Sequence, residues 1–360
     1  MVENAYIHIP FCRSRCKYCS FTSFTDLSLK EDYLNSLLLE IEYNYKGEDL
    51  KTLYIGGGTP SLLTVNEVYN IISKFNFNKN SEITMESNPD SVDEEYLKNL
   101  KGIGINRVSF GCQTFNDEIL KIIGRRHTSK MALDALSWTK KAGFKNINFD
   151  FIYGLPNQTI EIFTDDLKKA VELGINHISL YGLKIDEGCY FYDNMPQNIA
   201  DNDTQADMYV GAINLLENLG FIHYEISNFA KEGFQSRHNL NYWNNNTYYG
   251  FGCSAHGYVE KIRYSNSNSL KNYIKNPTVK EFTHEVSKQE GLEEEIFLGF
   301  RKMSGININE INKKYEINFN KKYEKILKKY SDFITKTELG FKLNNQGILI
   351  SNIILSDFLE

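Results

Sequence analysis

Apolar and polar residues follow two alternating patterns over the first two thirds of the chain. Short apolar runs predict strands over residues 6–9, 52–55, 81–86, 108–112, 146–152 and 177–183. The segments between them carry apolar residues at helical spacing, and several of these helices are expected to end at a glycine such as Gly143 or Gly174. Three predicted helix starts show the Ser/Thr-x-x-Glu pattern of a capping box, at Ser28, Thr64 and Ser91.

This serial order of strands and helices indicates the fold class. Strand-then-helix units in series are typical of an α/β protein, with a parallel sheet and crossover helices. Six such units are too few to close an eight-stranded barrel. We therefore expect an open, partial (β/α)6 barrel of the TIM type, and a flat doubly wound sheet is the alternative.

The pattern changes after residue 225. Residues 226–268 are rich in Asn, Ser and Tyr and lack periodicity, which predicts a segment made mostly of loops. Helices are predicted from about residue 290 onward, and residues 333–343 that follow them are predicted to form two short strands around a turn. We expect an α/β core over 1–225, a loop-rich segment over 226–289, and a small α+β domain over 290–360, for which a winged-helix form is one candidate.

Composition narrows the class of protein. Hydrophobic residues make up 41% and charged residues 24% of the 360 positions, which is typical of a globular chain and excludes disorder. No run approaches the roughly 18 consecutive apolar residues of a membrane span. The N-terminus lacks the basic and apolar regions of a signal peptide, so a cytoplasmic location is expected.

Charge argues against nucleic acid as the main partner. The net charge is −6, with 40 Lys and Arg against 46 Asp and Glu. The lysine-rich stretch 312–330 lacks aromatic residues in a clear register for stacking on bases, so we interpret it as a solvated helix face. A nucleic-acid-binding module that uses a metal centre structurally remains one of three functional hypotheses.

The strongest chemical signal is three cysteines within eight residues, Cys12, Cys16 and Cys19, directly after the first predicted strand. Thiolates are soft ligands that favour zinc, Cu(I) or iron–sulfur centres. Three of them can hold one cubic cluster and leave its fourth metal corner open for a small molecule. A structural zinc site would need a fourth ligand at a recognisable spacing, and none follows nearby, so zinc is the weaker alternative.

A second signal is the run 56–60, Gly-Gly-Gly-Thr-Pro, which follows the second predicted strand. Consecutive glycines let the backbone approach a ligand closely and present N–H groups to it. A tight strand-to-helix turn is the alternative. Because α/β proteins bind ligands at the carboxyl ends of parallel strands, this position favours the ligand interpretation.

Several motifs in order resemble one known group of proteins. The segments are YIHIPFCRSRCKYC at 6–19, GGGTP at 56–60, MESNP at 85–89, SFGCQTFN at 109–116 and NFDFIYGLP at 148–156. Together they resemble the radical S-adenosylmethionine (SAM) superfamily, and more narrowly the oxygen-independent coproporphyrinogen oxidase group. The resemblance implies a [4Fe–4S] cluster on the three cysteines, SAM bound to its unique iron, and reductive cleavage of SAM to a 5′-deoxyadenosyl radical.

The resemblance also implies a set of SAM contacts. Tyr18 would pack on the adenine, and Arg125 would pair with the methionine carboxylate. Glu86 and Asp150, at strand ends, would accept hydrogen bonds from the ammonium or the ribose hydroxyls. The full set of implied contacts is Tyr6, Tyr18, Gly57, Gly58, Thr59, Glu86, Gln113, Arg125 and Asp150.

Two departures from the oxidase pattern and one motif match favour the heme-chaperone branch of this group over the oxidase branch. Position 21 is Phe where the oxidases have a further Cys, and only five residues precede Tyr6 where the oxidases carry an extension. The segment 238–243 matches the branch's His-Asn-x-x-Tyr-Trp motif. This implies heme contacts from His238, Tyr242 and Trp243, and His256 or Cys253 is the alternative iron ligand.

The favoured hypothesis is therefore a SAM- and cluster-binding heme chaperone. Its expected partners are heme, a heme-accepting protein and an electron donor for the cluster, with no nucleic acid and no integral membrane segment. Oxidative decarboxylation of coproporphyrinogen III is the alternative, and we do not expect that activity. The isolated cysteines Cys112, Cys189 and Cys253 are expected to lie away from the cluster.

Overall fold

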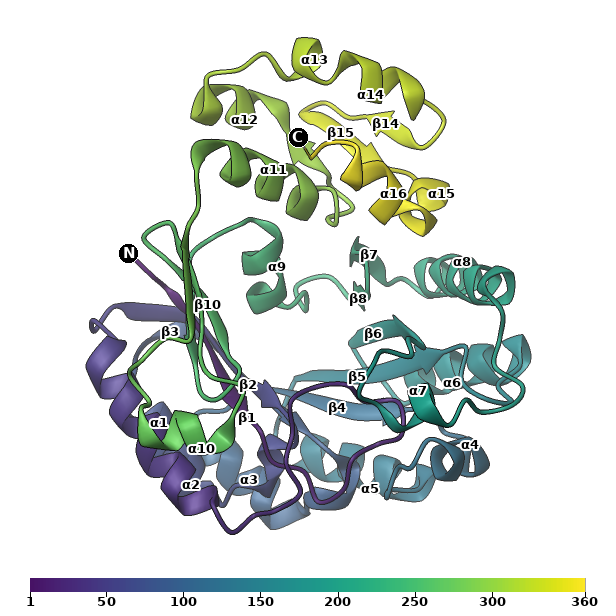
Figure 1. The fold of residues 1–360 in the computed structure, drawn as a ribbon. Coiled ribbons are helices and arrows are strands. Elements are labelled where there is room, and N and C mark those ends of the chain that lie inside the picture. The colour runs from purple at the N-terminus through teal and green to yellow at the C-terminus, as the bar shows by residue number, and fades with distance from the viewer. Residues whose placement is uncertain (360) are drawn as a thin grey trace.

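A computed structural model describes residues 1–359. Its main sheet has nine strands, in the order β7-β8-β6-β5-β4-β3-β2-β1-β9. Strands β1 to β6 pair in parallel, each with the next along the chain. Their bounds are β1 (Asn4–Ile9), β2 (Asp49–Gly57), β3 (Asn76–Ser87), β4 (Arg107–Gln113), β5 (Asn146–Tyr153) and β6 (His177–Gly182). The six predicted strands are confirmed, and the curved sheet forms an open barrel (Figure 1).

A helix follows each of these six strands and covers the convex outer face of the barrel (Figure 1). These are α1 (Lys30–Asn44), α2 (Val65–Ile72), α3 (Glu94–Gly102), α5 (Ser129–Lys141), α6 (Ile160–Glu172) and α8 (Asn202–Asn218). Shorter helices lie in the connections after β2, β3, β4 and β6. These are η1 (Pro60–Leu62), η2 (Pro89–Ser91), α4 (Asp117–Ile122) and α7 (Tyr190–Asp193). The predicted series of strand–helix units is therefore confirmed.

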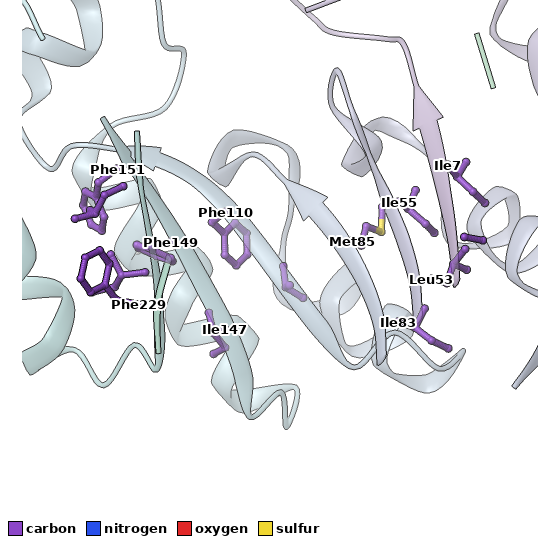
Figure 2. Packing of buried hydrophobic residues seen from close by; sticks show 14 of the residues in the cluster. Ile7, Leu53, Ile55, Ile83, Met85, Phe110, Ile147, Phe149, Phe151 and Phe229 are labelled. Carbon is purple, nitrogen blue, oxygen red and sulfur yellow. The ribbon is translucent and has the colours of Figure 1, made fainter. Parts of the chain in front are cut away.

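The core between the sheet and the outer helices is a row of apolar side chains in register. Ile7 on β1 lies opposite Ile55, and Ile55 lies opposite Met85. Farther along the sheet, Phe110 on β4 lies opposite Phe149 on β5, and all five side chains are fully buried (Figure 2). Parallel strands covered by helices carry such apolar rows, which explains the short apolar runs in the sequence.

One of the three predicted capping boxes is confirmed. Thr64 accepts a hydrogen bond from the Glu67 N–H, and the Glu67 side chain accepts one from the Thr64 N–H. The predictions at Ser28 and Ser91 are wrong. Helix α1 begins at Lys30 without a side-chain cap, and α3 is capped by Asp93. The hydroxyl of Ser91 donates instead to the carbonyl of Asn88, within η2.

Residues 226–268 combine loops with short helices and strands that the sequence pattern did not predict. The strand β8 pairs antiparallel with β6 and β7, and β9 pairs parallel with β1, so this part of the chain extends both edges of the main sheet. A separate three-stranded sheet lies next to β9. The elements are β7 (Ile222–Glu225), β8 (Asn228–Ala230), α9 (Arg237–Trp243), β9 (Tyr249–Phe251), β10 (His256–Val259), β11 (Ile262–Ser265), α10 (Leu270–Lys275) and β12 (Phe282–Glu285).

The C-terminal part is a small α+β unit above the barrel opening, drawn in yellow-green to yellow (Figure 1). Its strands are β13 (Ile306–Asn307), β14 (Ile334–Lys336) and β15 (Gly340–Leu343), paired antiparallel in the order β13-β15-β14. Its helices are α11 (Lys288–Gly299), α12 (Ile308–Tyr315), α13 (Phe319–Lys322), α14 (Glu324–Lys329), α15 (Asn345–Leu349) and α16 (Ser351–Ser356). The two strands predicted around a turn are confirmed. Within residues 1–359, no helix is long and apolar enough to cross a membrane.

Phe149 should be among the side chains on which barrel stability depends, because it is fully buried and packs against the rings of Phe110 and Phe151. We expect Phe149→Ala to lower the free energy of unfolding by about 3–5 kcal/mol, through lost burial and a residual cavity. The change is measured by thermal or denaturant unfolding. The control Phe282→Ala, at a ring that is 56% exposed, should change stability little, and equal losses in both variants would contradict this packing.

Candidate functional site

The cysteine loop lies at the carboxyl edge of the barrel, directly after β1. Backbone hydrogen bonds close its base, with Cys12 N–H donating to the Phe24 carbonyl and Phe24 N–H donating to the Pro10 carbonyl. The N–H of Lys17 donates to the carbonyl of Ile123, which attaches the loop to the end of α4. The loop is therefore held at two places while its cysteines stay partly exposed.

The three thiols of this loop lie within electrostatic range of one another. The Cys12 thiol accepts a hydrogen bond from the Thr59 hydroxyl at 3.4 Å, and the Cys16 thiol accepts one from Arg125 Nη1 at 3.4 Å. Burial raises the pKa of the Cys12 and Cys19 thiols, so a metal that binds them must displace protons.

Ligands of a single metal ion converge on one point, whereas a cluster holds each thiolate on a different iron. Over residues 1–359, no three or more His, Cys, Asp and Glu side chains are placed to hold a single ion. The three thiols of the loop, with a guanidinium beside Cys16, have the donor chemistry of a cluster site.

The other three cysteines lie elsewhere. Cys112 donates to the Thr114 carbonyl, and Cys253 donates to the Ser267 carbonyl at 3.1 Å. Cys189 is buried in a separate apolar cluster. Burial raises the pKa of the Cys253 thiol to about 12.

The glycine run after β2 lies against the cysteine loop. A Cβ atom on Gly58 would lie 3.0 Å from the Cys12 sulfur and 2.6 Å from the Phe11 carbonyl oxygen. Gly57 has a φ of +118°, and a Cβ there would lie 2.9 Å from the His8 ring. Only glycine fits these two positions, so the run lets backbone groups come close to the cysteine sulfurs.

Glu86, at the end of β3, is the acidic group nearest to this glycine run. Its Oε2 accepts a hydrogen bond from the Gly57 N–H at 3.0 Å, and its Oε1 accepts one from the Tyr54 hydroxyl at 2.8 Å. Burial raises the pKa of Glu86 to about 7, and the nearby Asp150 carboxylate contributes to this shift. Glu86 therefore changes charge near neutral pH, which suits a group that meets a cation or a hydroxyl.

Gln113 ends β4, and Asp150 lies inside β5, three residues before the strand ends at Tyr153, so the expected place of Asp150 at a strand end is corrected. Gln113 has a φ of +68°, and its buried Oε1 has no hydrogen-bond partner within residues 1–359. Asp150 accepts a hydrogen bond from Asn148 Nδ2 at 2.7 Å, and burial raises the pKa of its carboxyl. A buried acceptor without a partner is costly unless a ligand supplies a donor, so Gln113 fits a site built for a polar cofactor.

Arg125 connects the cysteine loop to β4. Its Nη2 donates to Asn88 Oδ1 at 2.8 Å and to the Gly111 carbonyl at 2.6 Å, while its Nη1 reaches Cys16. The two aromatic residues of the implied set flank this region. Tyr6 bonds to His8 Nδ1 at 2.9 Å, and Tyr18 packs against a small apolar cluster that contains Ile122.

The implied heme residues do not share one face. His238 is 1% exposed, with Nδ1 2.7 Å from the Thr52 hydroxyl and Nε2 2.8 Å from the Tyr242 hydroxyl. Burial, with Arg107 nearby, lowers the pKa of His238 to about 3, so the ring is neutral. Trp243 lies toward the C-terminal unit, where the Arg301 guanidinium is 5.6 Å from its ring. The alternative ligand His256 is exposed on β10.

The hydrogen-bond network sets the tautomer of His238. The Thr52 hydroxyl donates its proton to Asn4 Oδ1, so it accepts from His238 Nδ1–H. The lone pair of Nε2 then accepts from the Tyr242 hydroxyl. The sequence argument missed Thr52 and Tyr54, although strand alternation from Gly56 places both on the same face of β2 as the glycine run.

Comparisons with known proteins decide the family. Residues 6–170 match the model of the radical SAM superfamily. The heme chaperone HemW of Lactococcus lactis is 38% identical over 362 residues, which cover 95% of each chain. The HemW of Bacillus subtilis is 37% identical and covers 99% of each chain, and that of Escherichia coli is 37% identical over 71% of this chain and 70% of its own. The chain belongs to the HemW family. This confirms the resemblance to the radical SAM superfamily and its heme-chaperone branch.

A solved structure shows the same fold. HemN, a coproporphyrinogen III oxidase from Escherichia coli and a radical SAM enzyme, has a TM-score of 0.87 to this chain at 21% identity. The similarity covers 99% of this chain and 90% of that chain. It confirms the fold class, an open α/β barrel of the radical SAM type with a smaller C-terminal α+β unit.

The cysteine loop gives a direct test of the cluster site. We expect Cys16→Ala to abolish the visible absorbance of a cluster after anaerobic reconstitution with iron and sulfide, because two thiolates cannot replace three. The control Cys112→Ala removes a buried thiol that bonds to a backbone carbonyl, and it should retain the absorbance. Retention of a full cluster in Cys16→Ala would show that this loop is not the ligand set.

Proposed function

We propose that this chain is a heme chaperone that binds a [4Fe–4S] cluster and SAM and transfers heme to an acceptor protein. The observation that carries the proposal is the His238-Asn-x-x-Tyr-Trp segment in a chain whose relatives are named heme chaperones. The proposed partners are heme, an acceptor protein and an electron donor for the cluster, and the proposed location is the cytoplasm.

Cys12, Cys16 and Cys19 would hold the cluster, and the residues around the glycine run would hold SAM. Together the cluster and SAM supply one-electron reductive chemistry at the sulfonium when they are bound. Gly57 and Gly58 leave room beside the Cys12 sulfur, and Gln113 offers an acceptor without a partner in residues 1–359. The other proposed SAM contacts are Tyr6, Tyr18, Thr59, Glu86, Arg125 and Asp150.

His238 has the protonation state and the hydrogen bonds of an imidazole that could bind iron. A metal-binding imidazole is neutral, and its second ring nitrogen donates a hydrogen bond that fixes the tautomer. His238 is neutral and donates from Nδ1 to Thr52, so Nε2 carries the lone pair that would bind iron. The Tyr242 hydroxyl now occupies that lone pair, and heme binding through His238 requires this hydroxyl to move.

The aromatic residues of the motif lie beside a cavity of about 670 Å³. Tyr242 and Trp243 line it from α9, Arg263 lines it from β11, and Phe297 lines it from α11. A volume of this order is typical of ligand pockets, which span roughly 300–1,000 Å³. Aromatic rings suit the flat faces of a macrocycle, so the proposed heme contacts of Tyr242 and Trp243 lie here, beside an Arg263 guanidinium that is paired with Glu294 at 2.8 Å.

The histidine is tested by titrating heme into the reconstituted protein. We expect His238→Ala to weaken heme binding and to leave the cluster absorbance unchanged, because the cluster ligands lie in a different loop. His256→Ala is the matched control, since it removes an exposed imidazole on β10. If His256→Ala loses heme while His238→Ala binds it normally, the ligand assignment moves to His256.

Oxidation of coproporphyrinogen III is the second candidate, favoured by the fold shared with HemN. The side chain at position 21 argues against it, because Phe21 is 70% exposed and cannot supply the thiol that the oxidase motif carries there. We expect the reconstituted protein with SAM and a reductant to form no protoporphyrinogen. Robust formation of that product under anaerobic conditions would replace the chaperone proposal with the oxidase.

A further inference from the structure

A short chain of contacts joins the heme motif on α9 to the proposed cofactor site. The His238 ring stacks on the Tyr54 ring, with centroids 5.1 Å apart and planes inclined by 28°. The Tyr54 hydroxyl donates to Glu86 Oε1 at 2.8 Å, and the Gly57 N–H donates to Glu86 Oε2 at 3.0 Å. One tyrosine side chain therefore lies between the motif histidine and the carboxylate beside the glycine run.

Tyr54 and the Gly57 backbone together set the orientation of the Glu86 carboxylate. Each carboxylate oxygen has one of these two donors, and the backbone donor is fixed by β2. The side chains of Tyr54 and Glu86 pack closely against the backbone of Gly56. A Cβ on Gly56 would lie 2.9 Å from Tyr54 Cε1 and 3.0 Å from Glu86 Oε1. The Tyr54 hydroxyl is thus the one side-chain donor that holds the carboxylate against the glycine run.

Tyr54 is itself held between two rings. Tyr6 stacks on it at 6.2 Å between centroids, and His238 stacks on it at 5.1 Å. His238 cannot shift freely, because Thr52 and Tyr242 bond to its two ring nitrogens. Thr52 belongs to the same strand as Tyr54, so the histidine is fixed relative to the ring on which it stacks.

The start of α9 is anchored independently of these rings. The backbone N–H groups of Arg237 and His238 donate to the Glu82 carboxylate of β3, at 3.3 Å and 3.2 Å. A carboxylate at a helix N-terminus stabilises that end of the helix. The backbone at the start of α9 is therefore held by β3 independently of the contacts of the His238 side chain.

We propose that Tyr54 is a positioning residue that couples the heme motif to the cofactor site, through the stack with His238 and the hydrogen bond to Glu86. This inference rests on the proposed function for the identity of the two ligands. Iron that takes Nε2 of His238 displaces the Tyr242 hydroxyl and repositions the ring on Tyr54. Heme then changes the affinity for SAM, and SAM changes the affinity for heme by the same factor.

The experiment measures SAM affinity by equilibrium dialysis on the full chain with its cluster reconstituted, with and without heme. We expect Tyr54→Phe to weaken SAM binding about tenfold, the loss expected for one hydrogen bond to a carboxylate. The variant keeps the stacked ring, and unchanged cluster absorbance shows that it folds. Tyr96→Phe is the matched control, because it removes a hydroxyl that donates to the Leu63 carbonyl at 2.8 Å, and it should bind SAM as the wild type does.

Heme gives the second readout. In the wild type we expect saturating heme to change the SAM dissociation constant at least about fivefold, the lower end of the usual range of coupling between sites. In Tyr54→Phe this ratio should fall close to one. A wild-type ratio of one, or the same ratio in both proteins, would overturn the coupling.

The pH profile separates positioning from a general structural effect. The Tyr54 hydrogen bond lowers the pKa of Glu86, so its loss should move the acid limb of SAM affinity to higher pH. Tyr54→Phe leaves in place the other titratable or charged groups around this carboxylate. These are Asp150 on β5, Arg107 on β4, Tyr6 on β1, Tyr181 on β6 and Tyr242 on α9.

The outcomes distinguish this inference from the proposed function. Equal SAM affinity and equal pH profiles in Tyr54→Phe and the wild type overturn the positioning role and leave the heme chaperone intact. A uniform loss of affinity at every pH indicates a structural effect and also overturns it. Wild-type protein that retains its cluster yet binds no SAM overturns the cofactor part of the proposed function, and with it this inference.

Discussion

The parallel pairing of β1 to β6 is the constraint on which the candidate site depends. Parallel strands all end at the same edge of the sheet, so residues far apart in sequence meet there. The cysteine loop follows β1, and the glycine run begins at the end of β2. Glu86 and Gln113 lie at the ends of β3 and β4, and Asp150 lies three residues before the end of β5. A change in the order or direction of any of these strands would separate the groups.

The two faces of the sheet have different chemistry because they meet different neighbours. The outer face packs under helices and carries the row from Ile7 to Phe149. The inner face carries polar side chains that bond to one another, as where Asn148 bonds to Ser109 and Asp150. Buried polar groups are tolerated when they are hydrogen-bonded. Here burial raises the pKa of Glu86 and Asp150, and the hydrogen bonds that these carboxyl groups accept lower it. The polar interior of the barrel thus both fixes the positions of these side chains and shifts the pKa of its carboxyl groups.

The helix α9 connects the interior of the barrel to the C-terminal unit. It lies over the inner face of the barrel beneath the C-terminal unit (Figure 1), and it brings His238 into contact with β2. His238 faces β2, whereas Trp243, on the same helix, lies toward Arg301. The His-Asn-x-x-Tyr-Trp segment therefore contacts two parts of the molecule. His238 contacts β2, and Tyr242 and Trp243 line a cavity together with residues of β11 and α11.

The sequence alone determined the features that local patterns encode. Apolar runs located the strands β1 to β6, and glycine and cysteine spacing located the loops after β1 and β2, because these signals depend on residues a few positions apart. Two capping boxes were predicted wrongly. Near Ser91 the side chain of Asp93 caps α3 instead, and near Ser28 no side chain caps α1, which begins at Lys30.

Tertiary structure alone decided the rest. The strands β8 and β9 are three residues each, too short to show a periodicity. Apart from the neighbouring β7, which also pairs with β8, their partners β6 and β1 lie more than 45 residues earlier in the sequence. The state of His238 depends on Thr52 and Tyr54, which lie more than 180 positions earlier and carry no local sign of that contact. Burial and hydrogen bonding to distant residues set the charge and the tautomer of this histidine, and only the folded chain brings those residues together.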